Sequence, residues 1–221
     1  PRRVRVYVPP VKHPPAPRPV LYLFDGQNLF DDAPSFAGGW HLHKSAHNLA
    51  RKSRAAPVLV GVDHGHAERL NELGPWHSAR GGGRTDALLD WMGGTLMPRM
   101  REDFGVASDP GHVGIGGSSL GGLAALYAHF RRPELFGLVL AMSPSLWLAQ
   151  GKIFDFVASC SKPWTSRIYL DAGGMEGGGM LANAQKMADA LRARGWDERS
   201  LMWVPVKTGK SVIGALSVDK V

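Results

Sequence analysis

The chain has 221 residues, of which 44% are apolar and 20% are charged, so it can bury one sizeable core and does not belong to the disordered class. Its formal net charge is +7, but the basic residues are scattered among acidic and apolar ones, which argues against nucleic-acid binding. The single cysteine, Cys160, excludes an intramolecular disulfide and argues against a structural zinc site, and we expect neither a metal nor a cofactor.

No stretch resembles a signal peptide or a membrane span, so we expect a cytoplasmic protein without a membrane partner. The length favours a single domain over residues 1–221. The oligomeric state does not follow from the sequence.

Apolar runs alternate with helical patterns along the chain. The predicted strands are 4–8, 20–24, 58–62, 112–116, 138–141, 167–171 and 201–206, and the predicted helices are 43–54, 85–104, 119–131 and 180–194. Residues 9–19 and 67–84 are predicted loops, Thr85 is predicted to cap its helix, and Pro205 places the last strand near a sheet edge. This alternation predicts an α/β fold with a mostly parallel sheet and helices on both faces.

The segment Gly117-Ser118-Ser119-Leu120-Gly121 fits the pattern Gly-x-Ser-x-Gly and lies between a predicted strand and a predicted helix. In such a nucleophile elbow, the strained serine projects its hydroxyl at the carboxyl end of the sheet. The helix that follows directs backbone N–H groups toward an oxyanion formed beside it. Ser119 is therefore the candidate nucleophile.

Loops that follow parallel strands share one edge of the sheet, and this edge is expected to hold the other catalytic groups. The N–H of Leu120 is the natural first donor of an oxyanion hole, and the N–H of Gln27, in the turn after the second strand, is the favoured second donor. The acid is expected after a later strand, where Asp171 and Glu176 are both candidates.

Five stretches together resemble the putative-esterase family of α/β-hydrolases, which includes enterochelin esterases, esterase D and feruloyl esterases. They run in family order from about residue 1 to 206, at 21–31, 60–65, 116–123, 142–147 and 168–176. The resemblance implies an α/β-hydrolase fold without a large cap and ester hydrolysis through an acyl-serine. It favours Glu176 as the acid, with Asp171 as runner-up, because the family's acid ends a Gly-x-x-Asp/Glu stretch.

The family resemblance also suggests residues that contact the substrate. Trp40 and Trp147 resemble walls of the acyl or alcohol pocket, although core packing is an equal alternative for each. Asn28, in the same turn as Gln27, is a third candidate.

The general base is the missing part. The family histidine follows the last strand, but this chain has no histidine after His129, and the corresponding stretch 209–216 reads GKSVIGAL. The tail 211–221 is thus atypical, and a frameshift and genuine divergence both remain open. His64 or His66, which follow a strand at the expected edge, could substitute as base, and Lys210 could do so if burial lowered its pKa.

The sequence therefore predicts a serine carboxylesterase that hydrolyses small acyl or aryl esters, impaired if no base is recruited. A weak or inactive homologue that binds esters or carbohydrates is one alternative. An acyltransferase, in which an alcohol replaces water, is another.

Overall fold

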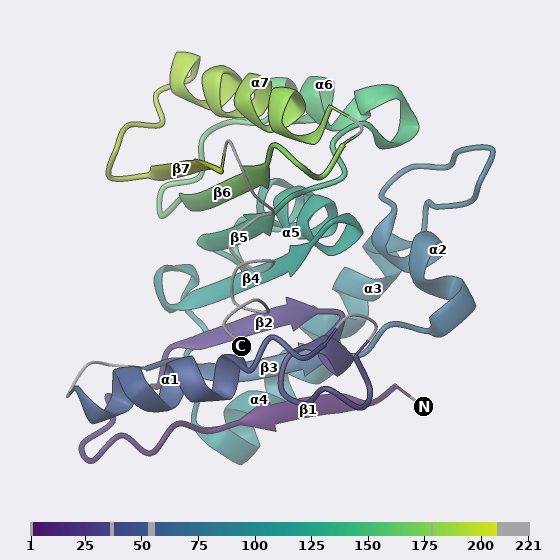
Figure 1. Ribbon diagram of the computed structural model, residues 1–221. Coiled ribbons are helices and arrows are strands. Elements are labelled where there is room, and N and C mark those ends of the chain that lie inside the picture. Colours follow the sequence, from purple (N-terminus) through teal and green to yellow (C-terminus); the bar gives the residue numbers. More distant parts are fainter. Residues whose placement is uncertain (1, 36–37, 53–55, 178, 207–221) are drawn as a thin grey trace.

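A seven-stranded sheet forms the centre of the molecule, with strand order β1-β3-β2-β4-β5-β6-β7 (Figure 1). The computed structural model describes residues 2–35, 38–52, 56–177 and 179–206. The strands are β1 (Val4–Tyr7), β2 (Val20–Phe24), β3 (Val58–Val62), β4 (Val113–Ser118), β5 (Leu138–Met142), β6 (Arg167–Gly173) and β7 (Leu201–Val206). The helices are α1 (Leu42–Arg51), α2 (Arg69–Leu73), α3 (Thr85–Trp91), α4 (Met97–Phe104), α5 (Leu120–Arg131), α6 (Lys152–Ser159) and α7 (Met180–Ala193).

Every neighbouring pair of strands is parallel except β1 and β3, which pair antiparallel with Val4 opposite Val62. Because β1 runs the other way, its first residues lie at the edge where the parallel strands end (Figure 1). Among the described strands, β7 lies at one edge of the sheet and β1 at the other, which confirms the edge position predicted from Pro205. The basic start of the chain is thereby placed beside the loops that were expected to carry the chemistry.

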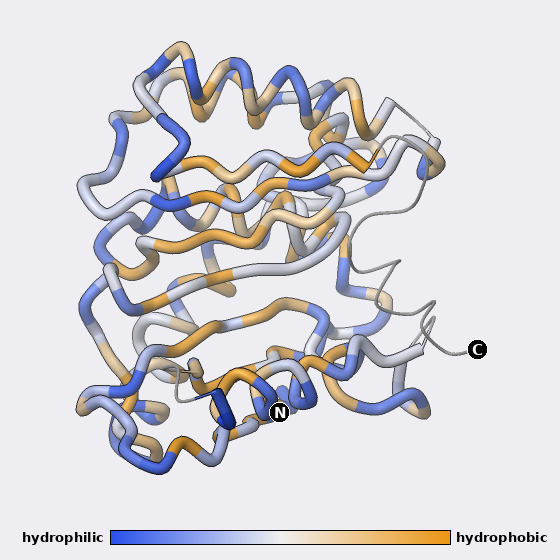
Figure 2. Tube along the Cα trace, turned by 60° about the vertical axis from the view of Figure 1, so that its left-hand side comes forward, coloured by the Kyte–Doolittle hydropathy of each residue, from blue (hydrophilic) through white to orange (hydrophobic). Residues whose placement is uncertain are grey.

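Helices cover both faces of the sheet, and apolar residues concentrate along the strands and the inward sides of the helices (Figure 2). The larger core contains buried side chains of α3, α4, α5, α6 and α7. A smaller cluster on the other face joins Leu23, Leu29, Trp40 and Met142, with Leu42 of α1 packed against it. This is the predicted α/β-hydrolase architecture, and the described ranges contain no large cap domain.

Three local predictions were wrong. The segment 67–84 is not all loop, because it contains α2, whose Arg69 is held by an ion pair that a local pattern does not reveal. The helix at 85–104 is interrupted by a π-helical turn, Met92–Leu96, and its cap is Arg84, since Thr85 is buried inside the first turn. α6 was not predicted.

Among the described residues, no helix is both long enough and apolar enough to cross a bilayer.

His129 of α5 is fully buried in a network that requires the neutral imidazole. Its Nδ1 lies 2.8 Å from the carbonyl oxygen of Phe136, and its Nε2 lies 2.7 Å from Oγ of Ser166. The indole Nε1–H of Trp196 donates to the same Ser166 oxygen at 2.8 Å. Nδ1–H therefore donates and Nε2 accepts, and burial lowers the pKa of His129 to about 4.

This burial predicts an acid-sensitive fold. The pKa of His129 rises from about 4 in the folded state to about 6.5 on unfolding, so the unfolded chain binds the extra proton between these values. The contribution of His129 to the free energy of unfolding should be fully present above pH 6.5. It should decrease by about 3 kcal/mol as the pH falls toward 4.

Urea unfolding at pH 7 and pH 4.5 measures the effect, with His129→Gln as the variant that lacks the titrating group and His112→Gln as an exposed control. Between pH 7 and pH 4.5, the free energy of unfolding should decrease less in His129→Gln than in the wild type. Equal losses in all three proteins would rule out His129 as the cause.

Candidate active site

Ser119 forms the turn between β4 and α5. Its backbone has φ 57° and ψ −116°, a conformation that costs a residue with a side chain about 1–3 kcal/mol. Glycine is required two residues earlier, because a Cβ on Gly117 would lie 2.7 Å from the carbonyl carbon of Gly121. The structure thus contains the sharp strand-to-helix turn that the sequence predicts, with Ser119 partly exposed at the carboxyl end of β4.

The end of β5 and the loop that follows it hold Ser119 on several sides. The N–H of Ser119 donates to the carbonyl of Met142 at 2.9 Å, and its own carbonyl accepts from the N–H of Ser145 at 3.0 Å. The hydroxyl oxygens of Ser119 and Ser145 are 3.0 Å apart and share a hydrogen bond. Within the described residues, Ser145 is therefore the partner of the candidate nucleophile.

Among the described residues, both predicted oxyanion donors have N–H groups without an acceptor. Neither Leu120 N–H nor Gln27 N–H donates to an acceptor in the described part of the chain. Leu120 begins α5, where the first N–H groups have no partner in the helix and the helix dipole is positive. Gln27 lies in the short 3₁₀ turn Gly26–Asn28, which is pressed against β3: a Cβ on Gly26 would lie 2.6 Å from the carbonyl carbon of Gly61.

Asp25, which precedes this turn, is only 2% exposed and carries a charge that needs a partner. The guanidinium of Arg69 supplies it through two hydrogen bonds of 2.7 Å, one to each carboxylate oxygen. Asp25 also has a left-handed backbone, with φ 58° and ψ 47°. The ion pair attaches to α2 the turn that contains Gln27. Arg69 therefore supports the backbone of one predicted donor without donating a hydrogen bond itself.

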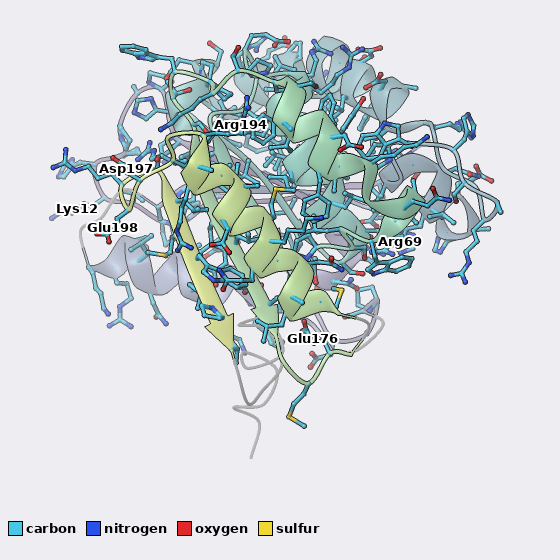
Figure 3. The ribbon with its side chains drawn as sticks, turned by 90° about the horizontal axis from the view of Figure 1, so that it is seen from above. Lys12, Arg69, Glu176, Arg194, Asp197 and Glu198 are labelled. Carbon is cyan, nitrogen blue, oxygen red and sulfur yellow. The ribbon has the colours of Figure 1, made fainter. Side chains whose placement is uncertain are left out.

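The two candidate acids have different surroundings. Asp171 is fully buried, and its carboxylate accepts from the Ser143 N–H at 2.9 Å and the Tyr169 hydroxyl at 3.0 Å. Glu176 lies on the loop after β6, where its Oε2 accepts from the Ser143 hydroxyl and from the Gly173 N–H at 3.0 Å. Figure 3 shows Glu176 at the end of the molecule toward which β7 points, opposite Asp197. Asp171 is thus enclosed in the core, whereas Glu176 is partly accessible on its loop.

In the part of the chain that the structure describes, no hydrogen bond joins His64 to Ser119. The Nδ1 atom of His64 accepts from the His66 N–H at 2.9 Å, and the His64 N–H faces Oε1 of Gln27 at 3.4 Å. With Nδ1 accepting, the neutral ring carries its proton on Nε2 and offers no second acceptor. Burial lowers the pKa of His64. No described histidine hydrogen-bonds to Ser119, and Lys210 lies outside the described residues.

The three predicted substrate contacts have different exposures. Trp147 is 44% exposed on the loop after β5, as a pocket wall would be. Trp40 is 9% exposed and belongs to the smaller apolar cluster, which favours the packing alternative. Asn28 is partly buried, and its carbonyl accepts from the N–H of Trp40 at 2.7 Å.

A cleft of about 750 Å³ begins at Gln27 and extends along the start of β1. Arg2, Arg3 and Arg5 line it together with Asp63 and Glu72. Arg2 pairs with Glu72, and Arg5 pairs with Asp63 through hydrogen bonds of 2.8 and 2.9 Å. Among the described residues, Arg3 has no carboxylate partner, so the cleft has an excess positive charge.

Sequence reasoning missed Arg69, Ser143, Ser145 and the arginines of the cleft. One signal was available for Arg69, because an aspartate directly after a buried strand requires a cation or several donors. The arginines alternate with valines in the first strand, but only the antiparallel pairing of β1 shows that they reach the active edge.

Comparison with known proteins finds that the family model described as putative esterase matches residues 1–202. The Bacillus subtilis protein named "Uncharacterized protein YbbA" is 27% identical over 218 residues, which cover 90% of this chain and 82% of that protein. The iron(III) salmochelin esterase of Escherichia coli is 32% identical over 151 residues, 66% of this chain, but the match spans only 32% of that esterase. Among solved structures, an IroE-like serine hydrolase from Shewanella oneidensis has a similar fold, with a TM-score of 0.79 and 18% identity over 99% of this chain and 73% of that one.

The Asp25–Arg69 pair predicts a large stability loss when only one partner is removed. Arg69→Met leaves a buried carboxylate without its counter-charge and should lower the free energy of unfolding by about 3 kcal/mol. Arg84→Met is the matched control, because its ion pair with Glu68 is exposed and should contribute about 1 kcal/mol or less. Urea unfolding compares the two variants, and an equal, small loss in both would show that the buried pair does not hold this turn.

Proposed function

The chain belongs to the putative-esterase family, and on this premise we propose that it hydrolyses carboxylic esters through an acyl-serine intermediate on Ser119. The observation that carries the proposal is the strained turn at Ser119, which presents the hydroxyl beside the uncommitted N–H of Leu120. Family membership supports ester hydrolysis in general, and the geometry of the turn supports the serine mechanism.

In the proposed reaction, Oγ of Ser119 attacks the carbonyl carbon of the ester while its proton passes to a base. The tetrahedral oxyanion accepts hydrogen bonds from the N–H groups of Leu120 and Gln27. Collapse breaks the bond to the alcohol, which leaves with a proton, and water then hydrolyses the acyl-serine by the same sequence of steps. Glu176 would orient the base.

The described residues give Ser119 a hydroxyl partner rather than a basic one. Without a general acid, an alkoxide is a poor leaving group, whereas a nitrophenolate needs little help. We therefore expect aryl esters to be the best simple substrates, with a residual acceleration from the oxyanion donors and from binding.

The cleft indicates the substrate class. Its excess positive charge lies next to Gln27, so an ester bound at the proposed oxyanion hole could place an anionic group against Arg3. One relative is named an iron(III) salmochelin esterase and another a siderophore triacetylfusarinine C esterase, which adds siderophore esters to the substrates to be tested first.

Ser119→Ala should lower the hydrolysis of 4-nitrophenyl acetate by roughly 10²-fold or more, because no acyl-serine can form. The assay measures nitrophenolate release, and Ser159→Ala, on the exposed end of α6, serves as the control that should keep the wild-type rate. Wild-type turnover by Ser119→Ala would disprove the serine mechanism.

Arg3→Gln should reduce kcat/KM for a 4-nitrophenyl ester with a carboxylate in its acyl chain by about 2- to 5-fold and leave the neutral acetate ester unchanged. Half-molar salt should abolish the difference, since the charge is exposed. Arg199→Gln removes one positive charge away from the cleft. It should not change the preference between the two esters. If Arg3→Gln affects both esters equally, the cleft does not select for charge.

A further inference from the structure

The short loop Ser143–Ser145 after β5 contacts both the candidate nucleophile and the candidate acid. Ser143 is 4% exposed and Ser145 is 2% exposed, so both hydroxyls need hydrogen-bond partners inside the protein. Buried hydroxyls commonly bond to nearby backbone carbonyls. Here both side chains instead bond to the side chains that the proposed reaction uses.

Ser145 makes two hydrogen bonds to Ser119. Its N–H donates to the carbonyl of Ser119 at 3.0 Å, and its hydroxyl lies 3.0 Å from the hydroxyl of Ser119. The first contact supports the strained backbone, and the second restricts rotation of the Ser119 side chain. A freely rotating hydroxyl would be in the attacking position for only part of the time, so this restraint favours attack.

Ser143 makes the corresponding contact on the acid side. Its hydroxyl donates to Oε2 of Glu176, and its N–H donates to Oδ1 and to the main-chain carbonyl of Asp171 at 2.9 and 3.1 Å. Its φ of 41° is unfavourable for a residue with a side chain, and such strain is common at functional sites. Pro144 joins the two serines and limits the freedom of the chain between them.

We propose that Ser145 and Ser143 are positioning residues, the first for the Ser119 hydroxyl and the second for the Glu176 carboxylate. This assignment rests on the proposed function. Asp171 also has a structural task, because its carboxylate anchors the loop through the Ser143 N–H. The loop connects the proposed nucleophile and the proposed acid, which follow different strands, β4 and β6.

The test for Ser145 uses the full chain and ethyl fluorophosphonate as the probe. Oγ of Ser119 bonds to phosphorus, fluoride leaves, and the proton goes to solvent. Ser145→Ala should lower the second-order rate constant of phosphonylation by about 5-fold, the effect of one lost neutral hydrogen bond. For 4-nitrophenyl acetate, kcat should fall similarly while KM stays within about twofold.

Ser145→Thr, which keeps the hydroxyl, should recover most of the lost rate. Thermal unfolding of each variant shows whether the loop has been disrupted. The proposal is overturned if Ser145→Ala labels Ser119 at the wild-type rate, or if Thr loses as much rate as Ala. If the wild-type protein is never labelled at Ser119, the proposed function fails instead, so the two failures are distinguishable.

The test for Ser143 is a double-mutant cycle with Glu176. Ser143→Ala should lower kcat about 5-fold in the wild-type background and change it by less than about twofold in Glu176→Ala, because its effect acts through that carboxylate. Ser143→Gly removes the same hydroxyl and accepts the positive φ, so it separates the lost hydrogen bond from backbone strain. The same loss in both backgrounds would contradict a positioning role toward Glu176.

Discussion

The close approach of α5 to the end of β4 is the constraint on which the rest of the site depends. Gly117 and Gly121 approach so closely that a residue with a side chain in place of Gly117 would clash with the backbone of Gly121. Ser119 must then take its strained backbone conformation, and α5 must begin at Leu120 with unpaired N–H groups. One steric contact thus sets the position of the hydroxyl and the direction of the helix dipole together.

Strained turns persist only when their surroundings hold them, and this protein supplies the restraint from two sides. Met142 at the end of β5 and Ser145 in the following loop bind the backbone and hydroxyl of Ser119. On the other side, the buried Asp25–Arg69 pair fixes the turn of Gln27. The predicted oxyanion donors therefore belong to rigid segments, as preorganised electrostatic stabilisation requires.

The strands of the core could be predicted closely from the sequence because their signal is local. β2, β3 and β7 have the predicted bounds, since continuous apolar runs end at turn residues or at the sheet edge. α2 and the cleft could not be predicted, because they depend on Arg69 reaching Asp25 and on β1 running antiparallel. Ser119, Leu120 and Gln27 were proposed from motif and strand order and Glu176 from the family resemblance, and their roles remain proposals. The sequence did not assign the general base. Among the described residues, only the hydroxyl of Ser145 hydrogen-bonds to the hydroxyl of Ser119.

The central claim is that Ser119 becomes acylated during turnover. Mass spectrometry of peptides from protein quenched during hydrolysis of a slowly deacylating 4-nitrophenyl ester tests it directly. The account predicts one acyl group on the peptide that contains Ser119, which disappears as turnover ends. Turnover with an unmodified Ser119, or with the acyl group on another residue, would contradict it.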